Sequence, residues 1–453
     1  MGGGRAFTLI ELMVALTGSL FFTIFVFMLS RDVSRFFQAQ SRTSDTTLAA
    51  ISGFERLRAD IARAGFLASP NLARDANRCP RPATGSTAAA PQQNGTDFDG
   101  FAGLQQMAML RITDTPTAVS SLPFYATLNN GVINPDGLTL YGNYSSTEQF
   151  PVRSMDFGTN PVSIRLEQDS PALLRVGIAA ATTDAAGTAI LTRIFRSGSI
   201  LRIVDETGRE QYAIISGATF ASGLGIVTIS NVPSLIQKGN TTLCGIRAHA
   251  AGLAINPVNI IRYSIDDVRT TYATNYQQLS YLFTGAVPSY EGTRLELMRY
   301  EVPPTVEATS TLVGVDWPGT TTKVTSLGEL VAEYAVDLAF GLTVLEDYQT
   351  GSMATLGETA NLDSYAGDPT DSSEAGAQVL LNATTGPHFI RGVHARLSVR
   401  YREADREAST LANPSAATAE ALLRVQVATG QFARTRSFRG HISTRNTQNL
   451  LWN

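Results

Sequence analysis

Glu11 is the residue whose type and position imply the most specific chemistry in this chain. It is the single charged residue in the run from Phe7 to Leu29, which otherwise holds apolar side chains with a few Thr, Ser and Gly. An ionised carboxylate inside a membrane costs about 2.5 to 3.5 kcal/mol on insertion scales. Glu11 therefore either lies close enough to the end of the run to reach the membrane interface or has a partner.

A short polar leader precedes this run. Residues 1–6 read Met-Gly-Gly-Gly-Arg-Ala, and Phe7-Thr8-Leu9-Ile10-Glu11 follows directly. This arrangement resembles the class III signal of type IV prepilins and type II secretion pseudopilins. The resemblance implies that a prepilin peptidase cuts between Ala6 and Phe7 and that Phe7 is then methylated on its nitrogen. Ala6 departs from the family pattern, which usually has Gly before the cut.

Cleavage before Phe7 would place a new cation close to Glu11. Residues four apart lie on one helix face, so the freed α-amine and the carboxylate would be one turn apart. Glu11 can neutralise this amine or the amine of a neighbouring subunit when helices stack. The resemblance implies the second role, in which Glu11 recruits subunits into a filament.

The remaining reactive side chains form no recognisable motif. Cys79 and Cys244 are the only cysteines, and their separation suits no metal motif. We expect one long-range disulfide between them if the head is exported, and two buried thiols otherwise. The four histidines lie far apart in the sequence, and no nucleophile elbow or phosphate-binding loop occurs. We therefore expect no metal, no cofactor and no enzymatic activity.

One long helix is expected to position Glu11. Residues 7–29 are long enough to cross a bilayer core of roughly 30 Å, and no small-residue cleavage site follows them. Residues 30–66 continue as an amphipathic half, with a polar stretch at 38–47 where the helix is expected to be weak. The apolar positions that recur every three to four residues are Leu48, Ile51, Phe54, Leu57 and Ile61. The helix is predicted to span roughly 85 Å and to stop at Gly65.

The end of this helix carries a second resemblance. Residues 54–66, which read FERLRADIARAGF, are similar to the end of the long helix in PilW-type minor pilins and J-type pseudopilins. The resemblance implies a mechanical role for this arginine-rich turn. The alternative is that the arginines form a solvated helix face.

The rest of the chain is expected to form a β-rich head. Residues 199–203 and 211–215 predict a hairpin, 225–229 a further strand, and 338–344 and 393–399 two half-buried strands. Phe389 to Arg402 and Phe432 to Asn446 resemble the last two strands of PilW-type minor pilins. Polar insertions at 347–387 and 404–418 are predicted to be surface loops.

Several arginines of these last strands alternate with apolar residues. The arginines in question are Arg396, Arg400, Arg402, Arg434 and Arg436. They are interpreted either as a basic patch for an acidic partner subunit or, preferably, as a solvated face with interleaved acids. A formal net charge of -4 leaves no broad basic field, so we expect no nucleic-acid partner.

The whole pattern predicts an α+β fold of the type IV pilin-like lollipop form. One long N-terminal α-helix, with a transmembrane first half, would pack on a large β-rich globular head. The expected domains are a leader at 1–6, a transmembrane half at 7–29, an amphipathic half at 30–66 and a head at 67–453.

The resemblance implies a minor pilin that joins a priming or tip complex for type IV pilus assembly. The implied partners are other minor pilins, the major pilin, a pilus-tip adhesin, the prepilin peptidase, the inner-membrane assembly platform and the membrane. Before assembly the protein would be single-pass in the inner membrane with its head in the periplasm. It would then lie at or near the tip of the pilus fibre on the cell surface, with roles in cell adhesion and twitching motility.

Two other functions fit the same sequence. A type II secretion pseudopilin of the J type shares the signal and the helix but is usually much smaller than 453 residues. A membrane-anchored β-rich adhesin or binding module would use the long loops. A membrane-anchored hydrolase is disfavoured by the absence of catalytic motifs.

Overall fold

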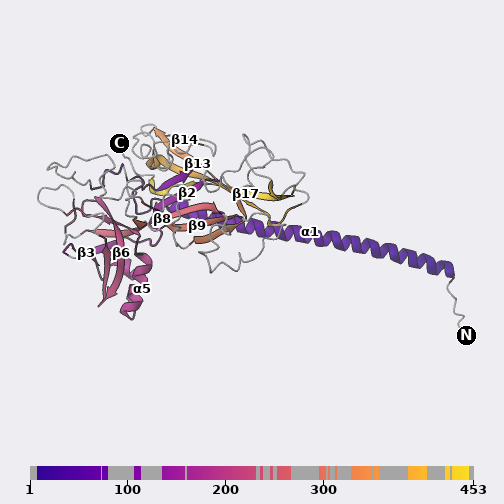
Figure 1. Cartoon of the computed structure of the whole chain (residues 1–453), viewed down its shortest axis with the longest axis horizontal. Coiled ribbons are helices and arrows are strands. Elements are labelled where there is room, and N and C mark those ends of the chain that lie inside the picture. Colours follow the sequence, from indigo (N-terminus) through magenta and orange to yellow (C-terminus); the bar gives the residue numbers. More distant parts are fainter. Residues whose placement is uncertain are drawn as a thin grey trace.

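The computed structural model of the chain describes residues 8–72, 74–79, 107–113, 135–158, 161–230, 235–237, 245–247, 252–266, 295–302, 305–306, 312–313, 328–347, 351–356, 386–405, 424–428 and 431–447. Within these residues the protein is a long N-terminal helix attached to a large β-rich head (Figure 1). The predicted α+β architecture is confirmed at this level.

Helix α1 (Leu9–Arg63) contains 55 residues and is therefore about 83 Å long. It is unbroken through residues 38–47, so the predicted weakness there is wrong. Thr46 and Thr47 donate their hydroxyls to carbonyls one turn earlier, which satisfies these polar side chains inside the helix. Arg42 also forms an ion pair of 2.5 Å with Glu403, so the head supports the polar stretch directly.

The helix ends where the sequence predicts. Gly65 has a φ of 72°, a left-handed conformation that a residue without a Cβ adopts at low cost. Its N–H donates to Tyr141 O at 2.7 Å, and Asn446 Nδ2 donates to Ala64 O at 2.7 Å. The terminal groups of α1 are therefore bonded to the head.

The larger sheet has ten strands, all paired antiparallel. The strands are β1 (Leu110–Thr113), β2 (Gly137–Gly142), β3 (Phe150–Asp156), β4 (Val162–Leu166), β5 (Ile200–Val204), β6 (Glu210–Ala221), β7 (Leu224–Ile229), β8 (Ala254–Asp266), β9 (Glu296–Val302) and β12 (Gly328–Glu333). Strand β8 is shared, because its first half pairs with β3 and β5 and its second half with β2 and β9. Strands β8, β3, β4, β7, β6 and β5 consequently form a closed ring.

The second sheet has five strands in the order β14-β13-β15-β17-β16. The strands are β13 (Ala335–Asp347), β14 (Ser352–Leu356), β15 (Ile390–Arg400), β16 (Arg424–Ala428) and β17 (Gln431–Ser443). A separate two-stranded pair contains β10 (Thr305–Val306) and β11 (Leu312–Val313). The short helices are α4 (Pro171–Arg175), η1 (Ile178–Ala180), α5 (Asp184–Ile194), η3 (Pro387–Phe389) and η5 (Arg445–Thr447).

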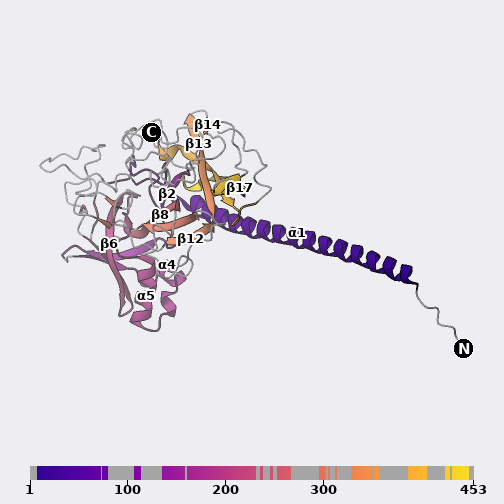
Figure 2. The same cartoon turned by 45° about the vertical axis from the view of Figure 1, so that its right-hand side comes forward.

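The second half of α1 is part of the main hydrophobic core. Phe54, Leu57 and Ile61 are buried together with residues of both sheets. The ring of strands encloses a second core together with α4 and α5, and these elements form the distal lobe. The distal lobe lies at the end of the head remote from the exposed first half of α1 (Figures 1 and 2). Of the apolar face predicted for residues 48–61, Leu48 and Ile51 are exposed, and burial of the part from Phe54 to Ile61 attaches the helix to the head.

The predicted hairpin is confirmed, with Ile203 paired to Gln211. The strand predicted at 225–229 is β7, and the two closing segments form β15 and β17, which pair along their length. Strands β13 and β15 are buried on nearly every residue rather than half-buried. The reason is that polar side chains on the second face pair with each other, as Arg396 and Ser398 do with Asp337.

The predicted surface loops differ from the structure in one place. Strand β14 lies within the segment 347–387 and forms an edge of the five-stranded sheet. Its side chains are mostly exposed, as expected of that segment, and Met353 is 59% exposed. Residues 357–385 and 406–418 lie outside the described residues.

Candidate assembly surface and helix junction

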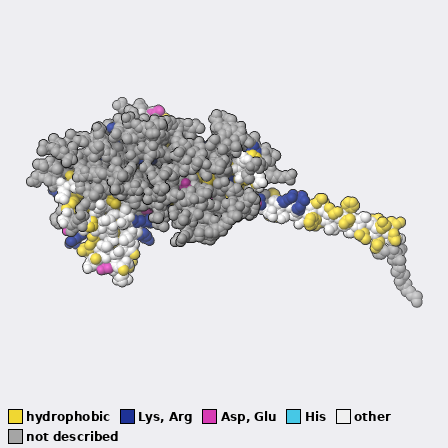
Figure 3. All heavy atoms as spheres, viewed as in Figure 1, with side chains coloured by type: hydrophobic (Ala, Val, Ile, Leu, Met, Phe, Trp, Pro, Cys, Tyr) yellow, Lys and Arg dark blue, Asp and Glu magenta, His cyan; other side chains and the backbone are white. Residues whose placement is uncertain are grey.

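The first half of α1 is an apolar rod that contacts no other part of the described structure. Its large side chains are exposed, with Phe21 and Phe27 each at 74%. Figure 3 shows hydrophobic side chains covering the outer part of the helix, with a basic group between them and the head. Among the described residues, α1 is the one helix long and apolar enough to cross a membrane. This half of the helix requires a lipid or protein environment that the head does not provide.

Glu11 has a definite position at the start of this rod. Its Oε2 accepts hydrogen bonds of 3.0 Å from both the backbone N–H and the hydroxyl of Thr8, and Thr8 Oγ1 accepts from Glu11 N at 3.3 Å. This reciprocal arrangement is a capping box. The carboxylate therefore lies at the positive end of the helix, next to the residue that follows Phe7. Ala6 and Phe7 themselves lie outside the described residues.

The capping role of Glu11 was missed by the sequence reasoning, although the signal was present. A Thr followed three residues later by Glu, at the start of an apolar run, is the pattern of a capping box. Glu11 thus has a partner within its own chain. A new amine on Phe7 would meet a carboxylate that is already held at the helix terminus.

A buried polar cluster fixes the other end of the helix to the head. Asp60 is 6% exposed, and its Oδ2 accepts from Tyr263 Oη at 2.8 Å and from Arg299 Nε at 2.6 Å. Its backbone carbonyl accepts from Tyr144 Oη at 2.9 Å. Arg299 also reaches Glu329 at 3.5 Å. Strands β8, β9 and β12 and the segment after β2 thus converge on one helical residue.

Both tyrosines of this cluster act as permanent donors. Burial raises the pKa of Tyr263 well above its ordinary value, and the charge of Asp60 raises it further. Burial and Asp60 have the same effect on the pKa of Tyr144. The phenol protons therefore stay in place across physiological pH, and the cluster holds its geometry.

The arginines near the end of α1 have two different roles, contact with the head and exposure to solvent. Arg56 pairs with Glu329 at 3.1 Å, and Arg63 donates to a backbone carbonyl of the β2–β3 connection at 2.6 Å. Arg58 is exposed and pairs with Glu55 inside the helix. One arginine therefore belongs to a solvated face, while the other two join the helix to the head.

Three of the five arginines of the closing strands are bonded within the head, whereas Arg402 and Arg436 are exposed, as the preferred interpretation of a solvated face expects. Arg396 Nε pairs with Asp337 at 2.8 Å, and Arg434 Nε pairs with Asp405 at 2.6 Å. Arg400 is 1% exposed, donates to two carbonyls and lies over the Tyr334 ring. These three side chains stabilise the head from within, and a docking role for them is not supported.

Cys79 is disulfide-bonded. Its predicted partner, Cys244, lies outside the described residues. The Cys79 N–H donates to Glu210 O at 2.9 Å, which aligns this segment with β6 in the distal lobe.

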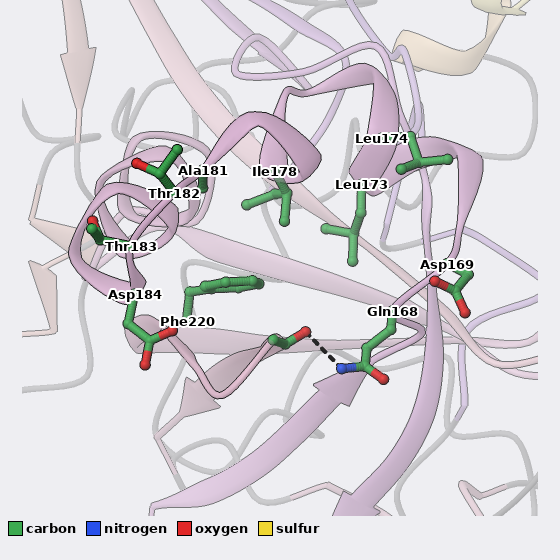
Figure 4. A pocket seen from close by; sticks show the side chains of 11 residues that line it. Gln168, Asp169, Leu173, Leu174, Ile178, Ala181, Thr182, Thr183, Asp184 and Phe220 are labelled. Carbon is green, nitrogen blue, oxygen red and sulfur yellow. Dashed lines mark hydrogen bonds between the residues drawn. The ribbon is translucent and has the colours of Figure 1, made fainter.

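The distal lobe contains a pocket of about 520 Å³ between α4, η1, α5 and the β6–β7 turn (Figure 4). Leu173, Ile178 and Phe220 form its apolar side, and the carboxyl groups of Asp169 and Asp184 lie at opposite sides of it. Much of the polar lining supports the local fold: Gln168 donates to the β6–β7 turn at 2.8 Å, and Asp184 accepts from the same turn at 3.2 Å. The pocket has the size of a small-ligand site, without an arrangement of groups that indicates a reaction.

The histidines are not all far apart in the folded chain. His394 and His441 lie side by side, with ring centroids 4.6 Å apart, whereas His388 is buried elsewhere against Asn71. His249 lies outside the described residues. No group of three or more His, Cys, Asp or Glu that could hold a metal occurs in the described part of the chain.

Comparisons with known proteins identify no relative of this chain. No family model matches it, and neither a curated protein nor a solved structure does.

Proposed function

We propose that this protein is a minor pilin of the PilW type, which joins a priming or tip complex for type IV pilus assembly. A prepilin peptidase would process it between Ala6 and Phe7, with methylation of Phe7. The proposal rests on the signal-like sequence around Glu11 together with one structural observation. That observation is a single helix whose first half is fully exposed and apolar while its second half is built into the core of the head.

This division of α1 suits a subunit that leaves the membrane for a filament. The exposed half has the length and composition to lie in a bilayer, and the same surface can pack against other apolar helices. The buried half keeps the head attached during the transfer. Under this proposal the head lies in the periplasm before assembly and on the pilus fibre afterwards.

The position of Glu11 supports the same function. A carboxylate held at the exposed start of the helix is available to the amine of a neighbouring subunit. Docking of such an amine would exchange the hydrogen bonds to Thr8 for an ion pair in an apolar environment, where the attraction is stronger than in water. The partners would be the major pilin, other minor pilins and the tip adhesin, assembled on the inner-membrane platform.

The proposal is tested by Glu11→Ala in a strain whose own copy is deleted. We expect the variant to be inserted in the membrane and cleaved normally, but to restore few pili. Glu55→Ala is the matched control, because Glu55 is an exposed carboxylate on the same helix and lies near the head. Normal pilus numbers with Glu11→Ala, or equal losses with both variants, would contradict the proposal. Recovery of the protein in sheared surface pili separates a pilus role from a secretion role.

A binding role is favoured by a different observation, the pocket in the distal lobe. Leu174 at its rim is 53% exposed, and the lobe lies at the end of the head farthest from the free helix (Figure 1). A membrane-anchored binding module would present this pocket outward. Loss of adhesion with normal pilus numbers in a Leu174→Glu strain would support this second function.

A further inference from the structure

We propose that His394 and His441 form a binding site for a transition-metal ion such as Zn²⁺ on the five-stranded sheet. The two residues are directly opposite each other on β15 and β17. Their ring centroids are 4.6 Å apart, and the rings are tilted by 51°. The site is independent of the proposed role in pilus assembly.

The ring nitrogens of the pair converge on one point. Thr343 Oγ1, on the neighbouring strand β13, lies 3.0 Å from His394 Nε2 and 3.5 Å from His441 Nε2. A zinc ion bonds imidazole nitrogens at about 2.0 to 2.1 Å, so two nitrogens on one tetrahedral ion lie roughly 3.3 Å apart. A small rotation of the two rings would let one ion contact both nitrogens beside the threonine hydroxyl.

The sheet holds this arrangement in place. Val393 and Ile442, the neighbours of the two histidines, point into the core and are buried, so the imidazoles project from the opposite face. Gly392 makes room for the pair, because a Cβ at this position would collide with the His441 ring. Metal binding would therefore require little reorganisation of the backbone, which favours affinity.

The surroundings permit a cation to reach the pair. His441 is exposed and His394 is partly exposed. The nearest positive charges on this face are Arg396, which pairs with Asp337, and Arg439, which is exposed and therefore screened by solvent.

The donor set selects the kind of ion. Imidazole suits Zn²⁺, Cu²⁺ and Ni²⁺, whereas Ca²⁺ and Mg²⁺ require oxygen ligands. The described residues supply two strong ligands, so water or a carboxylate from another molecule would complete the coordination. Such an open site binds metal more weakly than a closed four-ligand site and can join two protein surfaces.

The test is a calorimetric titration of the full chain in detergent with ZnCl₂. We expect one ion per chain for the wild type, no binding of CaCl₂, and affinity reduced about tenfold or more in His394→Ala and in His441→Gln. Because His441 is exposed, we expect His441→Gln to keep its fold, which circular dichroism verifies. His388→Asn is the control histidine variant and should bind zinc as the wild type does, because His388 is buried against Asn71 and is not part of the pair.

A second measurement identifies the ligands directly. Electron paramagnetic resonance of the Cu²⁺ complex should show two imidazole nitrogens in the wild type and one in His441→Gln. The proposal is overturned if the wild type binds no zinc, if both pair variants bind as tightly as the wild type, or if His388→Asn removes binding.

Discussion

The buried contact between Asp60 and Arg299 is expected to be the costliest single polar contact to disrupt where the helix joins the head. Asp60→Asn keeps the size of the side chain and removes its charge. Among the carboxylates of the described residues, Arg299, whose side chain is 12% exposed, would then retain only its contact of 3.5 Å with Glu329, and that group is 49% exposed. Removing one partner of a buried ion pair costs about 3 to 5 kcal/mol, because the other charge remains desolvated.

The matched control is Glu55→Gln on the same helix. Glu55 pairs with Arg58 at 3.3 Å, and both side chains are more than half exposed, at 58% and 57%. An exposed pair at this spacing contributes about 0.5 kcal/mol or less. The two variants therefore make the same chemical change in environments that differ in burial.

The assay is urea unfolding of the full chain in detergent, followed by far-ultraviolet circular dichroism. We expect the free energy of unfolding to fall by about 3 to 5 kcal/mol in Asp60→Asn and by about 0.5 kcal/mol or less in Glu55→Gln. A fall of less than about 1 kcal/mol in Asp60→Asn would refute the reasoning. The double variant Asp60→Asn with Arg299→Met removes both charges, and it should lose less stability than the sum of the single variants.

Two further predictions concern pH and have opposite signs. Burial and the nearby Glu210 raise the pKa of Asp75 to about 6, so its stabilising contribution is present below its unfolded pKa and is lost as the pH rises through 6. At pH 8 the free energy of unfolding, measured with urea, should therefore be higher in Asp75→Asn by about 3 kcal/mol relative to the difference between the two proteins at low pH. The prediction is contradicted if the free energies of unfolding of variant and wild type differ by the same amount at pH 4 and pH 8. Burial, with Arg74 and Arg391, lowers the pKa of His388 to about 4, so its contribution is present above its unfolded pKa and is lost as the pH falls towards 4. His388→Asn keeps an acceptor for Asn71, and between pH 7.5 and pH 4 its free energy of unfolding should fall by about 3 kcal/mol less than that of the wild type. If the thermal unfolding midpoints of the two proteins fall in parallel with pH, His388 is not the source of the pH dependence.

The elements that follow from local patterns were predictable from the sequence. The apolar run and the spacing of Leu57 and Ile61 predict α1, and alternation predicts β7 and the β5–β6 hairpin. The polar stretch at 38–47 misled because its stability comes from contacts with the head, including Arg42 with Glu403. Local composition carries no information about a partner so distant in the chain.

Long-range pairing explains what the sequence did not reveal about the site. Asp60 has no distinctive neighbours in sequence, and its partners Tyr263 and Arg299 are 203 and 239 residues away. The ion pair of Arg396 could not be assigned from the sequence for the same reason, since Asp337 lies 59 residues before Arg396. Strand β8 contains Pro257, a residue that disfavours a central strand. At Pro257 the strand pairs with β5 on one side, while the pairing with β3 ends at Ile255 and the pairing with β2 begins at Asn259.

The placement of these contacts has a mechanical consequence for the proposed function. A force on the exposed half of α1 enters the head along the packed half of the helix, from Arg42, which pairs with Glu403, to Asp60 and Arg63, which bind the ten-stranded sheet and the segment after β2. Strand β8, which Asp60 contacts through Tyr263, extends into the closed ring of the distal lobe, so the part of the load that enters at Asp60 passes along one continuous strand. Antiparallel ladders pulled along their strands share the load over many hydrogen bonds. The same chain of contacts that makes Asp60 costly to neutralise would thus keep the distal lobe in a fixed orientation relative to the helix.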